Sequence, residues 1–131
     1  MVRYTLIFMI ALSSLKCFSQ DKVYKDLSVP AFKSKLDSLS GEVLLDLRTP
    51  DELKNGVIPG ATYLDYFRLD FEKEVTKLDK DKIYFVYCAS GVRSAETMEL
   101  MSKHGFKGVY NLKDGFMAWK KRKMPVESFK K

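Results

Sequence analysis

The sequence predicts an α/β domain in which a small parallel β-sheet carries helices on both faces. Short apolar segments that end in polar loops alternate along the chain with segments of helical hydrophobic periodicity. This alternation makes the strands parallel and places helices over both faces of the sheet. The chain contains neither internal repeats nor low-complexity tracts, so we expect one domain.

The first segment of the chain is not expected to belong to that domain. One basic residue, Arg3, precedes ten uncharged residues, Leu6–Leu15, and the triplet Cys17-Phe18-Ser19 has a small residue at either end. This layout is typical of a secretory signal peptide, here residues 1–19, with Gln20 as the new N-terminus. The apolar run is shorter than the roughly 20 residues that span a bilayer. An N-terminal membrane anchor, a buried helix and a lipidated Cys17 are the alternatives.

The signal peptide predicts an exported protein, either periplasmic or secreted. Removal of residues 1–19 leaves 112 residues, with 21 basic against 17 acidic side chains and a net charge of +4. That length is sufficient for one domain, expected at residues 22–126. The basic residues are scattered apart from Lys120–Lys123 and the C-terminal lysines. We therefore expect attraction for small anions, no nucleic-acid partner, and no stable membrane association once the signal is removed.

The first half of the domain is expected to combine two helices with two strands. A helix is predicted at Val29–Leu39. The segment Glu42–Leu47 has the apolar character of a buried strand. A short helix follows at Asp51–Lys54, Pro59-Gly60 marks a turn, and Ala61–Leu64 is a weaker strand.

The second half contains the strongest strand and the strongest helix. A helix at Leu69–Lys77 leads to Lys82–Cys88, a strand rich in β-branched and aromatic residues. The helix Arg93–Lys103 follows and ends before Gly105, where a C-terminal helix glycine is expected. Its residues Ala95, Met98 and Met101 recur at helical spacing, which predicts a buried stripe.

The last two elements are a shorter strand within Lys107–Leu112 and a helix at Gly115–Lys121. Within that helix, Phe116 and Trp119 are expected in the core. The basic run Lys120–Lys123 is expected to be a solvated surface.

Candidate functional residues lie just after the strands, because ligands of parallel sheets bind outside the carboxyl ends of the strands. Cys88 ends the strongest strand and is the only cysteine of the mature chain. A lone thiol in an oxidising compartment is either buried and inert or reactive. The loop that follows carries the expected substrate-binding residues Ala89, Ser90, Gly91, Val92, Arg93 and Ser94.

The composition of this loop favours a reactive thiol. Small residues and Gly91 let backbone N–H groups converge on one point. The helix that begins near Arg93 adds unpaired N–H groups and its positive dipole end, and the guanidinium adds a charged fork of donors. These features favour the thiolate and create a pocket for a small anion. The alternative is that Cys88 ends a buried strand and merely packs.

Four motifs resemble those of single-domain rhodaneses, in the order found in that family. Cys88 to Ser94 resembles the active-site loop, a cysteine and an arginine separated by four residues. Asp46-Leu47-Arg48 resembles the family's Asp-x-Arg, and residues 56–61 resemble its Gly-His-Ile-Pro-Gly-Ala turn. Residues 112–119 resemble its late Gly-Gly-x-x-x-Trp segment, and the resemblance covers about residues 22–126.

The resemblance implies a rhodanese-like fold and sulfurtransferase activity. Cys88 would take a sulfane sulfur from thiosulfate or a similar anion, become a persulfide, and pass the sulfur to cyanide or a thiol, including a thiol on a partner protein. No metal and no cofactor is implied. Two positions depart from the family: Val57 replaces the common histidine, and Asp114 replaces the first glycine.

Other polar residues are expected to support the site or to lie outside it. Asp46 and Arg48 lie at the end of a strand and are expected to form a structural ion pair, with Glu52 as a further candidate partner. His104 is expected at the surface, because eleven helical residues place it roughly 16 Å beyond Arg93. Acid–base chemistry by a Cys–His pair is therefore not expected.

Two alternatives to sulfur transfer remain open at the level of sequence. A cysteine and an arginine at a helix N-terminus also occur in cysteine phosphatases and arsenate reductases, whose loop has one residue more. The four residues between Cys88 and Arg93 favour the tighter sulfur pocket. A binding module that keeps the fold without catalysis is the second alternative, and retention of both residues argues against it.

Overall fold

A computed structural model describes residues 21–131. The strands are β1 (Val23–Leu27), β2 (Val43–Asp46), β3 (Thr62–Tyr63), β4 (Ile83–Tyr87) and β5 (Gly108–Leu112). The helices are α1 (Val29–Ser38), α2 (Pro50–Leu53), α3 (Phe71–Thr76), α4 (Val92–Lys103) and α5 (Gly115–Lys121). The signal peptide expected at residues 1–19 lies outside the described residues.

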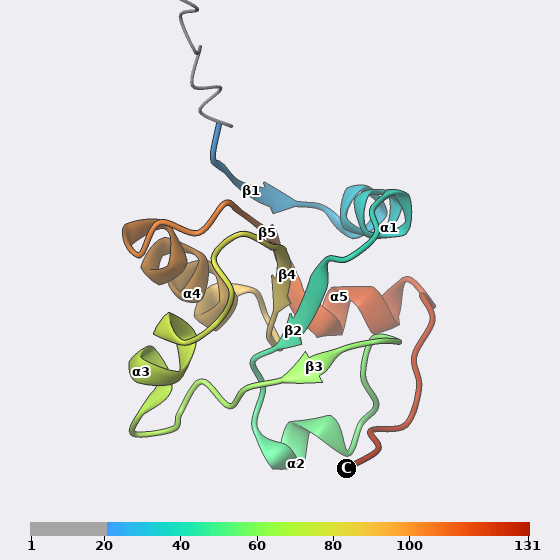
Figure 1. The fold of residues 1–131 in the computed structure, drawn as a ribbon. Helices are drawn as coiled ribbons and strands as arrows, with labels where there is room; N and C mark the ends of the chain where they lie inside the picture. The colour runs from blue at the N-terminus through green and yellow to red at the C-terminus, as the bar shows by residue number, and fades with distance from the viewer. Residues whose placement is uncertain (1–20) are drawn as a thin grey trace, which may run out of the picture.

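The strands form one parallel sheet in the order β1-β5-β4-β2-β3, with β4 at its centre. Helices α3 and α4 lie on one side of this sheet, and α1 and α5 lie on the other (Figure 1). The predicted fold class, a small parallel sheet with helices on both faces, is therefore confirmed. Because every strand runs in the same direction, the loops after β2 and β4 meet at one edge of the sheet.

The core divides into two clusters because successive side chains of a strand point to opposite faces. Phe85 and Tyr87 of β4 face α1 and α5, where they join Phe32 and Trp119. The intervening residues of β4, together with Cys88, face α3 and α4. The predicted core positions of Phe116 and Trp119 are confirmed, since both are buried.

Two elements differ from the sequence prediction. Strand β1 was not predicted, because Lys25 and Asp26 interrupt its apolar character. Those residues can stay exposed because β1 is an edge strand that pairs only with β5. On α4 the buried face is Ser94, Thr97 and Met101, whereas Ala95 and Met98 are only half-buried.

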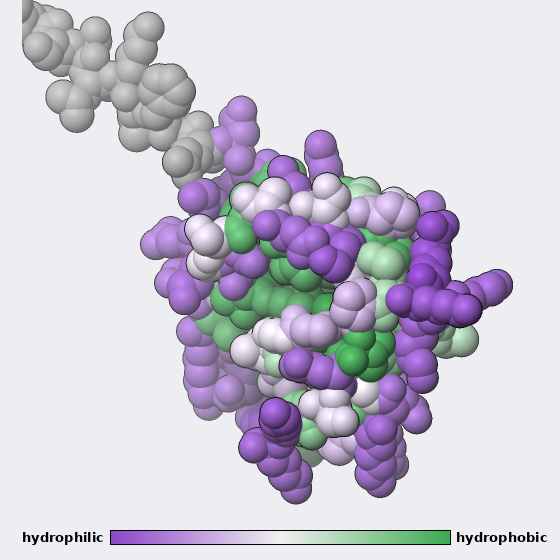
Figure 2. Space-filling model, turned by 90° about the vertical axis from the view of Figure 1, so that its right-hand side faces the viewer, coloured by the Kyte–Doolittle hydropathy of each residue, from purple (hydrophilic) through white to green (hydrophobic). Residues whose placement is uncertain are grey.

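The surface that carries α1, α5 and the C-terminal segment is mainly hydrophilic, with hydrophobic surface between the charged side chains (Figure 2). The basic run Lys120–Lys123 is exposed, as predicted. Among the helices of residues 21–131, none combines the length and the apolar character needed to cross a bilayer.

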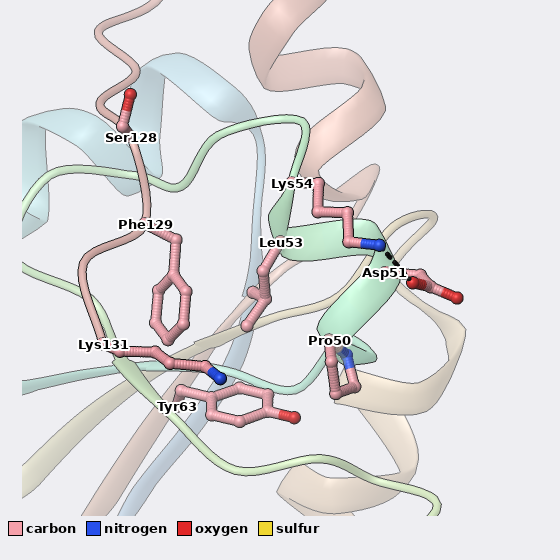
Figure 3. Close-up of a pocket in the computed structure, with 8 residues that line it drawn as sticks. All are labelled: Pro50, Asp51, Leu53, Lys54, Tyr63, Ser128, Phe129 and Lys131. Carbon is pink, nitrogen blue, oxygen red and sulfur yellow. Dashed lines mark hydrogen bonds and ion pairs between the residues drawn. The ribbon is translucent and has the colours of Figure 1, made fainter.

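The C-terminal segment fixes the turn that follows α2. Backbone hydrogen bonds of 2.8 and 2.9 Å join Val57 to Glu127, and the Phe129 ring packs edge-on against Tyr63. Between this segment and α2 lies a largely apolar pocket of about 720 Å³, with Leu53 in its wall (Figure 3). Val57 is buried here, so the position where the family commonly has histidine is an apolar, structural one in this chain.

Candidate active site

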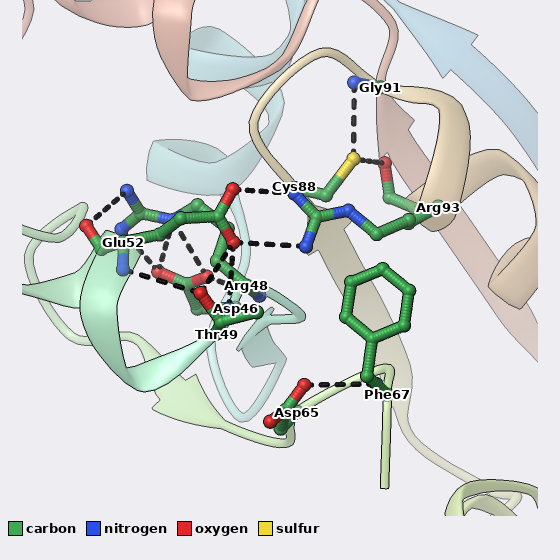
Figure 4. A network of polar contacts seen from close by, with 10 residues as sticks. Asp46, Arg48, Thr49, Glu52, Asp65, Phe67, Cys88, Gly91 and Arg93 are labelled. Carbon is green, nitrogen blue, oxygen red and sulfur yellow. Dashed lines mark hydrogen bonds and ion pairs between the residues drawn. The ribbon is translucent and has the colours of Figure 1, made fainter.

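Cys88 lies directly after β4, at the carboxyl edge of the sheet, and its side chain is fully buried. Its Sγ accepts a hydrogen bond from the Gly91 N–H at 3.1 Å and another from the Ser94 hydroxyl at 3.4 Å (Figure 4). Burial alone would fit a packing role. Two donors directed at one sulfur, however, are an arrangement that stabilises a thiolate.

The orientation of the loop follows from its contacts with α5. The carbonyl oxygens of Cys88 and Ala89 accept from the N–H groups of Phe116 and Met117, at 2.8 and 3.1 Å. Because a trans peptide places its N–H opposite its carbonyl, the N–H groups of Ala89 and Ser90 point away from α5. Helix α5 therefore orients the amide groups of the cysteine loop.

Two glycines allow this close approach. Gly91 has φ +94°, and a Cβ there would lie 1.9 Å from the carbonyl oxygen of Lys113. Gly115 has φ +70°, and its Cβ would lie 2.3 Å from the carbonyl oxygen of Ala89. Asp114 has φ −100°, which any residue adopts, so the position where the family commonly has its first glycine does not require one here.

Asn111 supports the cysteine loop from the neighbouring strand β5, and it is not among the residues predicted from the sequence. This buried side chain on β5 donates through Nδ2 to Asp26 at 2.8 Å and to the carbonyl of Gly91 at 3.4 Å. It thereby holds Gly91, the N-cap residue that precedes α4. A polar residue at an inward position of an otherwise apolar strand was the available signal.

Arg93 makes an ion pair that sequence analysis did not assign. Its Nη1 and Nη2 donate to the two carboxylate oxygens of Glu52, at 2.9 and 2.7 Å (Figure 4). The hydrogen bond from Arg93 lowers the pKa of Glu52 to about 2, and the same contact raises the pKa of Arg93. The guanidinium also lies 5.4 Å from the Phe67 ring. The charge that was expected to stand free for an anion is therefore paired.

Glu52 is held in place by the start of α2. Its Oε2 accepts from the Thr49 N–H at 2.8 Å, and the Glu52 N–H is directed at the Thr49 hydroxyl at 3.4 Å. This reciprocal pair is a capping box. The pattern Thr-Pro-Asp-Glu at residues 49–52 was therefore a sequence signal for the position of this carboxylate.

Asp46 and Arg48 form the predicted structural ion pair, and both are buried. Arg48 donates to the Asp46 carboxylate through Nε and Nη2, the shortest contact being 2.7 Å. It also donates to the carbonyl oxygens of Glu52 and Gly56, at 3.2 and 2.7 Å. The suggested participation of the Glu52 carboxylate in this pair is wrong, because only the main chain of Glu52 contacts Arg48.

This ion pair also touches the mouth of the site. The Arg48 guanidinium stacks on the Phe116 ring at 3.9 Å. Arg48, Glu52, Ala89 and Met117 are among the residues that line a small open cavity of about 230 Å³. Asp46 therefore holds Arg48 in the wall of this cavity beside the cysteine loop.

His104 follows α4 at the end remote from the loop and lies 3.5 Å from Glu72. It is half-buried there, and the whole of α4 separates it from the cysteine loop. Within residues 21–131, no cluster of three or more His, Cys, Asp or Glu side chains is arranged to hold a metal ion.

Together, the parallel sheet and the buried thiol on a glycine-containing loop at a helix N-terminus define a class of α/β proteins built around one cysteine. The chain belongs to the rhodanese-like domain family, whose model matches residues 28–122. It is 35% identical over 101 residues to the putative sulfurtransferase YtwF of Bacillus subtilis, covering 77% of this chain and 95% of that protein.

Further comparisons agree with this membership. A sulfurtransferase of Allochromatium vinosum is 28% identical over 101 residues, with 77% of this chain and 92% of that protein covered. The crystal structure of a rhodanese-like domain protein from Staphylococcus aureus superposes with a TM-score of 0.67 and 28% identity. That match covers 81% of this chain and 99% of the other.

Proposed function

We propose that the protein is a sulfurtransferase that moves a sulfane sulfur through a persulfide on Cys88. The donor would be thiosulfate or a similar small anion, and the acceptor a thiol or cyanide. The observation that carries the proposal is the pair of donors, the Gly91 N–H and the Ser94 hydroxyl, directed at Sγ. Family membership and the sulfurtransferase names of the relatives support it.

The reaction divides into two displacements. The Cys88 thiolate attacks the outer sulfur of thiosulfate, the S–S bond of the donor breaks, and sulfite leaves with the electron pair. The Cys88 persulfide anion is then attacked at its outer sulfur by cyanide or by an acceptor thiolate. Thiocyanate or a new persulfide leaves, and the Cys88 thiolate is regenerated.

The loop supplies what both displacements need. Negative charge on the sulfur is stabilised by the Gly91 N–H, the Ser94 hydroxyl and the N-terminus of α4. These groups act by hydrogen bonding and by the helix dipole, so the proposal needs no general base. The N–H groups of Ser90, Val92 and Arg93 have no accepting group among the described residues, and we assign them to the donor or to the outer sulfur.

The acceptor must come from outside the domain. Cys88 is the only free cysteine in residues 21–131, so no second thiol of that region can resolve the persulfide as a disulfide. A loaded enzyme should therefore persist until a thiol or cyanide arrives. A partner protein that presents a cysteine is compatible with this requirement.

We also propose that the protein works outside the cytoplasm, after removal of residues 1–19. The basis is the uncharged run Leu6–Leu15 and the small-x-small triplet that follows it. N-terminal sequencing of protein from the native host should begin at Gln20. An intact Met1 on protein from the cytosol would refute export.

The function is tested by thiocyanate production from thiosulfate and cyanide. Wild-type protein should turn over, and Cys88→Ser should not, because a hydroxyl without an adjacent base is a poor nucleophile. An aryl phosphate serves as the second substrate. Hydrolysis of that ester without thiocyanate formation would indicate phosphatase chemistry, and inactivity toward both would indicate a binding module.

A further inference from the structure

The two arginines nearest the cysteine loop are each paired with a carboxylate, whereas Lys120, which lines the same cavity as Ala89, has no ion-pair partner among residues 21–131. Arg93 is engaged by both oxygens of Glu52, at 2.7 and 2.9 Å, and Arg48 is engaged by the buried Asp46. The two arginines nearest the loop therefore bring no net positive charge to its mouth. An entering anion meets the Glu52 carboxylate together with the Arg93 guanidinium, and Lys120 is the one unpaired cation that lines the cavity among the described residues.

This pairing affects donors according to their charge. Thiosulfate is a dianion, and it approaches Cys88 past the Glu52 carboxylate, which already forms an ion pair with the Arg93 guanidinium. Its oxygens must either compete with Glu52 for Arg93 or bind through loop N–H groups alone. A hydropersulfide, R–S–SH, is neutral when protonated and carries one charge when ionised, so the same carboxylate opposes it much less.

The surface around the mouth favours a carbon-containing donor. Three large apolar side chains stand in solvent here. Their exposed fractions are 64% for Phe67, 62% for Val92 and 67% for Met117. Phe67 lies beside Arg93, Val92 belongs to the cysteine loop, and Met117 borders the cavity that Ala89 also lines. These three side chains offer no hydrogen bond to the oxygens of thiosulfate, so that Lys120 and the loop N–H groups are what remains for them, but they can contact the organic part of a persulfide.

We propose that Glu52 is a specificity-determining residue that turns this site toward organic persulfides and away from dianionic thiosulfate. The inference rests on the proposed sulfur-transfer function. In the loading step, the Cys88 thiolate attacks the outer sulfur of R–S–SH and the S–S bond of the donor breaks. R–S⁻ leaves with the electron pair, and the new S–S bond gives Cys88–S–SH.

The test compares two substitutions that each remove one negative charge from α2. Glu52→Gln frees Arg93 and keeps a side-chain oxygen that can accept from the Thr49 N–H. Asp51→Asn removes an exposed carboxylate that pairs with Lys54, away from the loop. Thermal unfolding confirms that both variants fold before their kinetics are compared.

The donors are thiosulfate and the persulfide of 2-mercaptoethanol, whose organic part is uncharged, with cyanide as the acceptor. Glu52→Gln should raise kcat/KM for thiosulfate about tenfold, mainly through KM, and change that for the persulfide by less than about twofold. The gain should shrink at high salt, because screening weakens the repulsion. Asp51→Asn should leave both values within about twofold of wild type.

Two failures can be told apart. If wild type transfers sulfur from both donors but Glu52→Gln leaves their ratio unchanged or lowers it for thiosulfate, the role of Glu52 is refuted and sulfur transfer stands. If wild type transfers sulfur from neither donor, the proposed function is refuted, and the inference that rests on it is refuted as well.

Discussion

Replacement of Gly91 by alanine tests whether the tight contact between two loops shapes the site. A Cβ at Gly91 would lie 1.9 Å from the Lys113 carbonyl oxygen, which is a backbone atom and cannot rotate away. Ordinary contact begins near 3.4 Å, so the loops must separate by about 1.5 Å. A movement of that size would break the 3.1 Å hydrogen bond from the Gly91 N–H to Cys88 Sγ.

The expected magnitude can be separated into two contributions. Gly41 and Gly60 have φ of +78° and +84°, and a Cβ added at either position would meet no atom within 4 Å. Alanine at these two positions therefore costs only the left-handed backbone, about 1–2 kcal/mol. Gly91→Ala adds the steric contribution and should destabilise by about 3 kcal/mol or more. At roughly 4 °C per kcal/mol, its Tm should fall by about 12 °C.

Urea unfolding and thiocyanate production measure the two consequences together. Gly41→Ala and Gly60→Ala should keep wild-type kcat/KM, whereas Gly91→Ala should lose about 100-fold, since misplacement by about 1 Å has costs of that order. If Gly91→Ala matched the two controls in both stability and activity, the loop contact would not shape the site.

Three further predictions concern charged and titratable side chains. Arg48→Met should lower the free energy of unfolding by about 3–5 kcal/mol in urea, because it leaves Asp46 buried and unpaired; a loss below about 1 kcal/mol would contradict this. Glu52 has its pKa lowered from 4.5 to about 2, so its contribution to stability is complete above pH 4.5 and disappears as the pH falls toward 2. Wild type should therefore exceed Glu52→Gln by about 1 kcal/mol at pH 7 and match it near pH 2; a difference that persists at pH 2 would refute the ion-pair explanation. His104→Gln should keep wild-type thiocyanate production, and a tenfold loss would show that the histidine acts on the site.

The sequence was sufficient to predict the parallel sheet and the position of Cys88. Continuous apolar runs such as β4 are characteristic of buried strands, and a strand–loop–helix order places the residue after β4 at the ligand-binding edge. The sequence was insufficient to predict β1, because the exposed residues Lys25 and Asp26 interrupt the apolar pattern of this edge strand. That strand is defined by its partner β5, which lies far along the chain.

Local sequence patterns were also insufficient to predict which charged side chains form ion pairs at the site. Arg93 and Glu52 are 41 residues apart, and only the fold brings their side chains together. Local patterns predict a free positive charge at Arg93 and make Glu52 a candidate partner of Arg48, whereas the fold pairs Glu52 with Arg93. The capping-box pattern at residues 49–52 indicates that a helix begins after Thr49, but not which arginine the Glu52 carboxylate meets.

The mass of the intact protein after incubation with a sulfur donor tests the central claim most directly. With thiosulfate or an organic persulfide and no acceptor, wild-type protein should gain the mass of one sulfur atom, and peptide mapping should locate it on Cys88. Cyanide should then restore the original mass with release of thiocyanate, and Cys88→Ser should gain nothing. Absence of the adduct on wild type with both donors, or an equal adduct on Cys88→Ser, would contradict a persulfide carried by this cysteine.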